Sequence, residues 1–262
     1  MKNSLPNIIV TGAGSGIGKE VALLLGQSNK VICTSKSKNC EDTVKEIGEN
    51  GSALICDFTD IISSELILTN FIDNFDDEID CVIHCAGFIG ESGPLENTNL
   101  SNWLKTFNIN FFSSVLIAKL LIPKFKKQGY GKFIFFGGGG SAYGYPVLPQ
   151  YSTSKTSLVR FVENLELEIK DENIETIILA PGAVDTSMLR DVLRKEKKYG
   201  SSSKVRSNSD IKEVVSFIKY MYENSFKSIS GKLVHINDDW KEFIKNNDPY
   251  KPDLWTLRRI EE

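Results

Sequence analysis

Short apolar runs rich in β-branched residues alternate with longer amphipathic segments along most of the chain. The seven runs cover residues 7–11, 30–34, 52–56, 79–84, 132–136, 176–180 and 232–236, and the amphipathic segments begin near Gly16, Glu41, Asp60, Asn99, Tyr151 and Ser209. Strands separated by helix-length segments pair in parallel, with helices covering both faces of the sheet. Because such crossovers are right-handed, we expect an α/β fold with a doubly wound, seven-stranded parallel sheet.

Composition and charge narrow the kind of protein this can be. The chain has 262 residues, 41% of them hydrophobic, so we expect one domain over residues 1–262. A net charge of −3 gives no general attraction to nucleic acid or an anionic membrane, which favours a small-molecule partner. The five cysteines lack metal-ligand spacing, so no metal site is expected. No secretory segment opens the chain and no run approaches the ~18 apolar residues of a membrane span, which favours the cytoplasm.

A glycine-rich turn, TGAGSGIG, starts at residue 11 between the first expected strand and the first expected helix. Gly12 suits a tight turn, Gly16 allows the backbone to approach a pyrophosphate at the helix N-terminus, and Gly18 allows close helix–strand packing. Ser15 and Ile17 complete the expected phosphate-binding turn. The alternative is a loop whose glycines serve flexibility alone.

Six motifs in this order and spacing resemble the short-chain dehydrogenase/reductase family, over about residues 7 to 236. They are TGAGSGIG, CDF at 56–58, CAG at 85–87, FNIN at 107–110, YSTSK at 151–155 and PGAVDT at 181–186. The resemblance implies a Rossmann-type domain that binds NAD(P) across the carboxyl ends of the strands. It also implies an oxidoreductase, commonly a homodimer or homotetramer, that acts on a carbonyl/secondary alcohol pair.

The end of the second expected strand bears on the choice of cofactor. The stretch ICTSKSK has no acid to hold an adenosine ribose 2′-hydroxyl, and it offers Ser35 and Lys36 instead. A hydroxyl and an ammonium suit a 2′-phosphate, so we expect NADP(H) in preference to NAD(H), with Lys38 as a second possible cation. The alternative is a solvated lysine in a lysine-rich loop.

The resemblance assigns further cofactor contacts. Asp57 and Phe58 are expected to flank the adenine, and Ala86 and Gly87 to line its ribose. Cys85 stands where the family usually has an asparagine, and the preceding His84 reads as a packed core histidine. The last motif supplies Pro181 and Gly182 for a turn, and Val184 and Thr186 for the nicotinamide carboxamide.

Tyr151 and Lys155 are one helical turn apart, so their side chains can share one face. At ~4 Å and an effective dielectric constant of ~20, such a charge interaction is worth roughly 4 kcal/mol. That energy would lower a tyrosine pKa by about three units, to near neutrality. We therefore expect Tyr151 to be the general acid/base and Lys155 to bind the nicotinamide ribose as well.

Asn110 matches the family asparagine that supports a water-linked proton relay to the lysine. Asn108 is a close competitor, but Trp103 stands seven residues before Asn110, as a tryptophan usually does in the family. The alternative is that Asn110 only kinks its helix.

The family serine expected thirteen residues before Tyr151 is absent, because that position is Gly138. Removal of an oxyanion donor costs about 10²–10³ in rate, which weakens an enzyme without abolishing it. Three readings stay open. In the first, Ser141 replaces the serine; in the second, a glycine N–H or a substrate hydroxyl does so; in the third, the protein binds NADP(H) without catalysis, as a regulatory or interaction protein.

Two regions bear on the substrate. Glycines at 137–140 leave room beside Tyr151, framed by Tyr143 and Tyr145, and residues 187–210 read as a mobile basic lid. Basic residues there suit a nucleotide-linked keto sugar, although a solvated charged face is the competing interpretation. The tail, residues 237–262, carries Trp240 and Trp255, which we expect to anchor it to its own or a neighbouring subunit.

Overall fold

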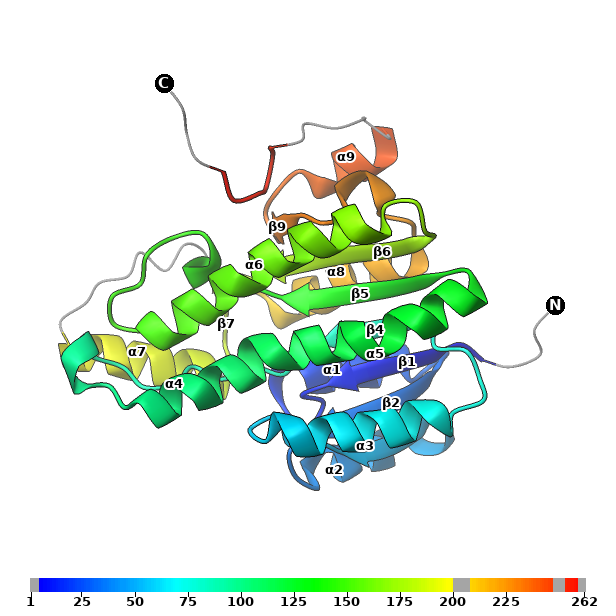
Figure 1. Ribbon diagram of the computed structural model, residues 1–262, viewed down its shortest axis with the longest axis horizontal. Helices are drawn as coiled ribbons and strands as arrows, with labels where there is room; N and C mark the ends of the chain where they lie inside the picture. Colours follow the sequence, from blue (N-terminus) through cyan, green and yellow to red (C-terminus); the bar gives the residue numbers. More distant parts are fainter. Residues whose placement is uncertain (1–4, 200–207, 247–252, 259–262) are drawn as a thin grey trace.

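The computed structural model describes residues 5–199, 208–246 and 253–258. Its main sheet has seven parallel strands in the order β3-β2-β1-β4-β5-β6-β9, which confirms the doubly wound topology expected from the sequence (Figure 1). The strands are β1 (Asn7–Thr11), β2 (Lys30–Ser35), β3 (Gly51–Ile55), β4 (Cys81–His84), β5 (Gly131–Phe136), β6 (Ile174–Ala180) and β9 (Leu233–His235).

Successive side chains of the central strands enter two different cores. In β5, Ile134 packs in one core, whereas Phe133 and Phe135 pack in the other. Strand β1 divides in the same way, with Ile8 on one face and Ile9 on the other. Because both faces are apolar, these strands are continuous hydrophobic runs, as buried parallel strands are.

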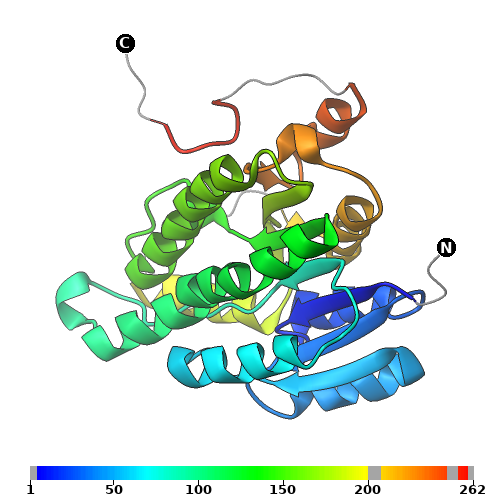
Figure 2. The ribbon, with the colours of Figure 1, turned by 45° about the vertical axis from the view of Figure 1, so that its right-hand side comes forward.

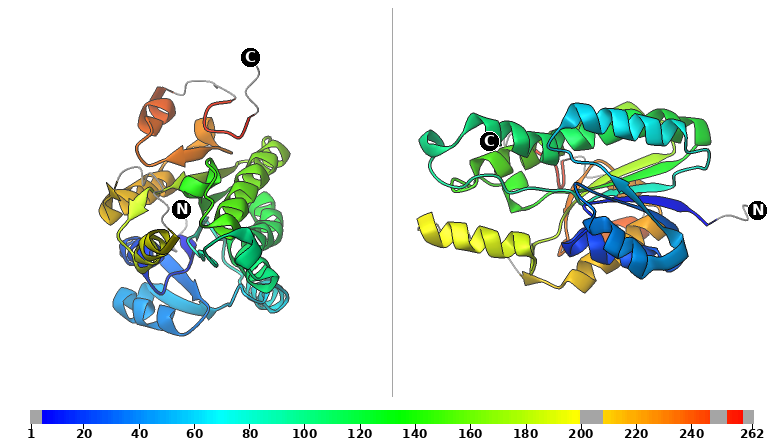
Figure 3. Two further views of the ribbon diagram at one scale, coloured as in Figure 1. Left: turned by 90° about the vertical axis from the view of Figure 1, so that its left-hand side faces the viewer. Right: turned by 90° about the horizontal axis from the view of Figure 1, so that it is seen from below.

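Helices cover both faces of the sheet, so the molecule has three layers (Figures 2 and 3). One face is covered by α1 (Gly16–Leu25), α2 (Asn39–Ile47) and α8 (Ile211–Glu223), and the other by α3 (Ile61–Asp73), α5 (Ser113–Gln128) and α6 (Pro149–Ile169). Short 3-10 turns occur at Gly48–Asn50, Leu95–Asn97, Gly139–Ser141 and Lys227–Ile229. The strands end toward one side of the molecule, where the long loops gather.

A continuous helical segment runs through α4 (Leu100–Phe107), a π-helical turn (Asn108–Phe112) and α5. This segment, Leu100–Gln128, is long and apolar enough to cross a membrane by length and composition. Its α5 part, however, places Leu116, Leu121 and Phe125 in the core beside β5. We therefore interpret it as a core helix of the three-layered fold.

The expectation of a mobile insertion at 187–210 is wrong for its first part. Residues Ser187–Tyr199 form helix α7, stabilised by pairs from Asp191 to Arg194 and to Lys195 one turn on. A two-stranded ribbon, β7 (Ala183–Val184) with β8 (Asn208–Ser209), joins the two ends of this region. Residues 200–207, with the basic Lys204 and Arg206, lie outside the described residues.

The described parts of the tail pack on the protein's own core, as its tryptophans led us to expect. Helix α9 (Trp240–Asn246) begins with Trp240, which contacts Phe217 of α8, and Trp255 packs on Phe243. The N–H of Leu233, in edge strand β9, donates to the Trp255 carbonyl at 2.9 Å. The tail thus covers the open edge of the sheet, while residues 247–252 and 259–262 lie outside the described ranges.

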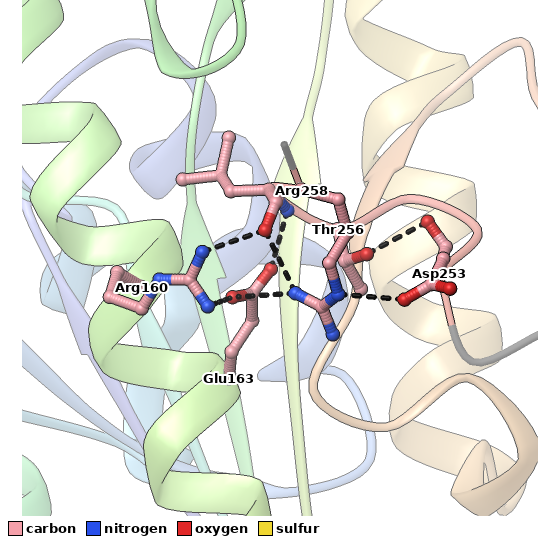
Figure 4. Close-up of polar contacts among 6 residues, drawn as sticks. Arg160, Glu163, Asp253, Thr256 and Arg258 are labelled. Carbon is pink, nitrogen blue, oxygen red and sulfur yellow. Dashed lines mark hydrogen bonds and ion pairs between the residues drawn. The ribbon is translucent and has the colours of Figure 1, made fainter. Parts of the chain in front are cut away.

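Glu163 of α6 holds the tail through a buried carboxylate (Figure 4). Its oxygens accept the Leu257 N–H at 2.7 Å and pair with Arg160 and Arg258. Arg160 also donates to the Leu257 carbonyl at 2.6 Å. One acidic side chain therefore links the tail backbone to the helix that carries Tyr151.

We expect Glu163→Ala to lower the melting temperature by roughly 3–8 °C, because it removes the buried carboxylate that accepts the Leu257 N–H and pairs with Arg160 and Arg258. The matched control is Asp42→Ala, which removes an exposed pair with Lys45 and is expected to leave the melting temperature unchanged. Thermal unfolding of both variants checks this. A Glu163→Ala protein that melts with the wild type would show that the carboxylate does not hold the tail.

Candidate active site

The glycine-rich turn after β1 has a shape that only glycine permits. Gly12 has φ of +66°, and a Cβ there would lie 3.0 Å from the backbone nitrogen of Ala86. A Cβ on Gly18 would lie 2.5 Å from the Gly12 carbonyl oxygen. The glycine-rich turn therefore packs on the backbone that follows β4, and the first turn of α1 packs on the end of β1.

The start of α1 fits the phosphates of a dinucleotide. Helix α1 has no acidic residue in its first turn, and the N-cap Ser15 makes no side-chain capping bond. Gly16 has φ of +55°, and a Cβ there would lie 3.6 Å from Cγ2 of Thr186. Ile17 packs partly against the core. An uncapped helix N-terminus beside a threonine provides the N–H groups and the positive dipole end that a pyrophosphate needs.

The residues expected around the adenosine of the cofactor differ in their exposure. Lys36 is exposed and makes no ion pair with any residue in the described ranges, whereas the Ser35 hydroxyl donates to the Ser37 carbonyl. Asp57 is exposed and accepts the Thr59 N–H at 3.0 Å. The ring of Phe58 is buried and lies edge-on to the His84 ring, so the expected adenine contact would come from the Phe58 backbone.

His84 organises the wall formed by Ala86 and Gly87. Its Nδ1 lies 2.8 Å from the Thr11 hydroxyl, and its Nε2 lies 2.8 Å from the Ser113 hydroxyl. The Ser113 hydroxyl donates to the Ile109 carbonyl at 2.6 Å, so it must accept from His84 Nε2–H. Nδ1 then accepts from Thr11, whose oxygen accepts the Ala86 N–H at 3.0 Å. We assign this tautomer from the network.

Burial, with a smaller contribution from the charge of the nearby Lys155, lowers the pKa of His84 to about 3. The imidazole is therefore neutral at pH 7, as the bond directions require. The interpretation of His84 as a packed core histidine is confirmed, since its side chain is 2% exposed. Its bonds join the end of β1 to Ser113, the first residue of α5, directly after the π-helical turn that contains Asn110.

Tyr151 and Lys155 lie in the first turns of α6, which begins two residues earlier than expected, at Pro149. Lys155 is buried, and its Nζ donates to the Phe136 carbonyl, at the end of β5, at 2.6 Å. Burial lowers the pKa of Lys155 to about 8. At neutral pH most of the ammonium remains charged, with two further N–H donors for a ribose.

The expected lowering of the Tyr151 pKa is wrong for this structure. Burial raises the pKa of Tyr151 to about 12, because the phenolate loses its hydration. The ammonium that was expected to oppose this effect is directed at the Phe136 carbonyl instead. Tyr151 is therefore a neutral phenol at pH 7.

Asn110 is fully buried within the π-helical turn. Its Oδ1 accepts the Phe88 N–H at 2.8 Å, and its Nδ2 donates to the Phe88 carbonyl at 2.8 Å and to the Ser154 hydroxyl at 2.9 Å. Asn108 instead donates to the Thr59 carbonyl. Because the Asn110 amide is used in these bonds, a proton relay at this residue would depend on its backbone.

The loop between β5 and α6 lies directly against the tyrosine. A Cβ built on Gly138 points at the Tyr151 hydroxyl, which agrees with the spacing of the absent serine. Ser141 is fully buried; its hydroxyl accepts the Gly138 N–H at 3.0 Å, and its own N–H donates to the Gly138 carbonyl at 2.8 Å. The Ser141 side chain thus holds the loop backbone, and its role toward a substrate stays a prediction.

Helix α7 lies over the site from the side where the strands end (Figure 3). Lys195 donates to the Gly90 carbonyl at 2.8 Å, and Glu196 accepts from Tyr145. Met188 approaches the position of a Gly87 Cβ to 3.6 Å. Polar contacts therefore hold α7 to the loop after β4 and to the loop between β5 and α6.

The basic side chains of α7 are less available to bind a phosphate than the sequence suggested, because three of them are paired with aspartates. Arg190 pairs with Asp185 at 3.6 Å, and Arg194 and Lys195 both pair with Asp191. Among the residues described, Lys197 and Lys198 are the exposed lysines of α7 outside these pairs.

The turn before α7 has the expected form: Pro181 and Val184 are buried, and Gly182 has φ of +73°.

The sequence missed Gln150, the residue before the tyrosine. It is fully buried, and its Oε1 accepts the Glu91 N–H at 3.0 Å and the Thr106 hydroxyl at 3.2 Å. A Cβ on Gly90, which has φ of +73°, would lie 2.5 Å from the same oxygen. In the sequence, the only signal of these hydrogen bonds was a polar residue beside the expected catalytic tyrosine.

We expect acid to destabilise the wild type through His84. Its pKa is about 3 when folded and ~6.5 when unfolded, so the unfolded chain binds more protons between these values. Stability present above about pH 6.5 is lost as the pH falls, by about 2–3 kcal/mol at pH 4.5. Urea unfolding at pH 7 and pH 4.5 of the wild type and His84→Asn isolates this contribution. An equal loss in both proteins would contradict it.

Known proteins resemble this chain in sequence and in structure. The sequence profile of the short chain dehydrogenase family matches residues 6–197. The 3-oxoacyl-(acyl-carrier-protein) reductase FabG of Buchnera aphidicola subsp. Baizongia pistaciae is 30% identical over 242 residues, covering 90% of this chain and 98% of that protein.

Solved structures share the fold. The NAD+-bound xylitol dehydrogenase superposes with a TM-score of 0.79 at 20% identity, over 90% of this chain and 99% of that one. The 3-ketoacyl-ACP reductase of Sinorhizobium meliloti 1021 superposes with a TM-score of 0.76 at 23% identity, over 88% and 96%. The chain therefore belongs to the short-chain dehydrogenase family and is an NAD(P)-dependent oxidoreductase.

Proposed function

We propose that the protein is an NADP(H)-dependent oxidoreductase that transfers a hydride between nicotinamide and a carbonyl/secondary alcohol substrate. One observation carries the proposal: a partly buried, neutral Tyr151 lies against the backbone of Gly138, one helical turn from the Lys155 ammonium. Asn110 is tied to the same helix through Ser154, whose hydroxyl donates to the Tyr151 carbonyl at 2.8 Å.

Each residue has a separate part in the proposed reaction. A bound nicotinamide would supply or accept the hydride at the substrate carbon. Tyr151 gives its phenolic proton to the carbonyl oxygen as the carbon is reduced, or takes a proton from the alcohol in the reverse direction. Lys155 holds the ribose hydroxyls, and Asn110 fixes the Phe88 backbone beside it. Ser141 holds Gly138 in place.

The raised pKa of Tyr151 favours one direction. A phenol with a pKa near 12 is fully protonated at neutral pH and ready to donate. Oxidation of an alcohol would need the phenolate, which burial disfavours. We therefore propose that carbonyl reduction is the faster direction at pH 7.

Two substrate classes have support. The curated relative is named for a 3-oxoacyl thioester, and the apolar Met188 beside Gly87 suits an acyl chain. A nucleotide-linked keto sugar was favoured by the basic lid, but that support is weaker because Arg190, Arg194 and Lys195 are paired. The alternative of a non-catalytic NADP(H)-binding protein predicts cofactor binding with no turnover of either class.

Cofactor and assembly follow the same reasoning. Lys36, exposed at the end of β2 without an ion pair in the described chain, supports NADP(H) over NAD(H). The cofactor site is otherwise proposed from the α1 N-terminus, Asp57, the Ala86–Gly87 wall and the turn from Pro181 to Thr186. We further propose a cytoplasmic homodimer or homotetramer with a small-molecule substrate.

Single-turnover reduction of a 3-oxoacyl thioester and of a keto sugar nucleotide, followed by loss of NADPH absorbance, tests the function. We expect Tyr151→Phe to slow turnover by about 10²–10⁴-fold with little change in NADPH affinity, because it removes only the proton donor. Tyr220→Phe, on α8, is the matched control and should react as the wild type does. A wild type that binds NADPH but reduces neither class would favour the non-catalytic alternative.

The cofactor preference is tested at Lys36. We expect Lys36→Glu to reduce the NADPH to NADH ratio of kcat/KM by about 10–100-fold, because a charge-assisted bond to the 2′-phosphate becomes a repulsion. Lys38→Ala, two residues on and also exposed, should change the ratio less. A wild type with a clear preference for NADH would overturn the assignment.

A further inference from the structure

The four consecutive glycines from 137 to 140 need an explanation other than backbone conformation. None of them has φ in the left-handed range, so the backbone there suits any residue. Their surroundings differ, however. A Cβ on Gly137 would lie 2.9 Å from Ile178, and a Cβ on Gly140 would lie 2.9 Å from Ser152. These two glycines allow close packing of the loop on the sheet and on α6.

The other two glycines form a contrasting pair. A Cβ on Gly139 would meet no atom within 4 Å. A Cβ on Gly138 would lie 2.7 Å from the Tyr151 hydroxyl oxygen, closer than real Cβ contacts come, whereas the next ring atom is 3.6 Å away. The steric conflict at Gly138 is therefore confined to a single oxygen, the one expected to carry the reacting proton.

The backbone is held in place on both sides of this contact. The N–H of Gly138 donates to the Ser141 hydroxyl at 3.0 Å, and its carbonyl accepts the Ser141 N–H at 2.8 Å. The preceding Gly137 N–H donates to the Leu179 carbonyl of β6 at 2.8 Å. Tyr151 belongs to the first turn of α6, which already packs closely on Gly140. With the backbone held on both sides, a side chain at 138 would have to shift the phenol hydroxyl at the end of the Tyr151 side chain.

We propose that Gly138 is a positioning residue for Tyr151: its bare backbone admits the phenol hydroxyl to space that a side chain at 138 would occupy. This inference rests on the proposed function. It follows that a serine at 138 cannot be restored by a single substitution, because the serine Cβ and the phenol would compete for one place. The reacting oxygen is then held without a side chain from residue 138.

A stability cycle tests the contact without reference to turnover. We expect Gly138→Ala to lower the melting temperature by roughly 2–8 °C in the wild type and by less than about 2 °C in the Tyr151→Phe background. The reason is that Tyr151→Phe removes the one oxygen in conflict. Gly139→Ala, the adjacent control, should leave the melting temperature unchanged or slightly higher in both backgrounds.

Kinetics test the positioning. We expect Gly138→Ala and Gly138→Ser each to lower kcat on the order of 10²-fold, with NADPH affinity within about twofold of the wild type, because a displacement of this size misplaces the proton donor. Gly139→Ser should retain the wild-type kcat. In the Tyr151→Phe background, Gly138→Ala should cause no further loss, since the residue acts through the hydroxyl.

The inference is overturned if Gly138→Ala melts with the wild type, if its loss is the same in both backgrounds, or if Gly138→Ser raises kcat. The stability cycle reads the contact whether or not the protein reduces a substrate. A protein that passes the cycle but turns over no carbonyl compound refutes the proposed function and leaves the placement of the phenol intact.

Discussion

The contact between the ends of β1 and β4 is the constraint on which the rest of the site depends. A Cβ on Gly12 would lie 3.0 Å from the Ala86 nitrogen, so this close approach needs a residue without a side chain. Beside it, the His84 ring bonds to the Thr11 hydroxyl. These neighbouring strands are where the order of the sheet reverses, so the chain leaves them toward opposite faces. Helix α1 begins after the end of β1 on one face, and α6 on the other face reaches the end of β5 through Lys155.

Side chains that are distant in sequence meet there because buried polar groups need partners. Asn110 satisfies both backbone groups of Phe88, and Lys155 binds the Phe136 carbonyl at the end of β5. These bonds compensate for the desolvation of the buried polar groups, and they fix the backbone around Tyr151. Removing one partner would strand the other in an apolar interior, which makes the arrangement rigid.

Much of the fold could be predicted from the sequence alone. The seven strands and their parallel pairing follow from apolar runs separated by helix-length segments, and the positions agree to within a few residues. The lid was mistaken for a mobile segment because its apolar positions are sparse, yet pairing to Asp191 and the contact with Gly90 stabilise α7. The π-helical turn at Asn110 had no local signal, since it depends on bonds to Phe88 and Ser154.

The sequence by itself determined the fold class, the glycine turn and the pairing of Tyr151 with Lys155 along one helix face, because periodicity and spacing are local properties. Only the tertiary structure decided the electrostatics and the close contacts. Burial raises the pKa of Tyr151 where spacing alone predicted a lowering, and the ammonium of Lys155 is directed at Phe136. In the sequence, Gly138 appears only as the position where the family serine is missing. The structure places it against the Tyr151 phenol, because distances between chain segments arise only on folding.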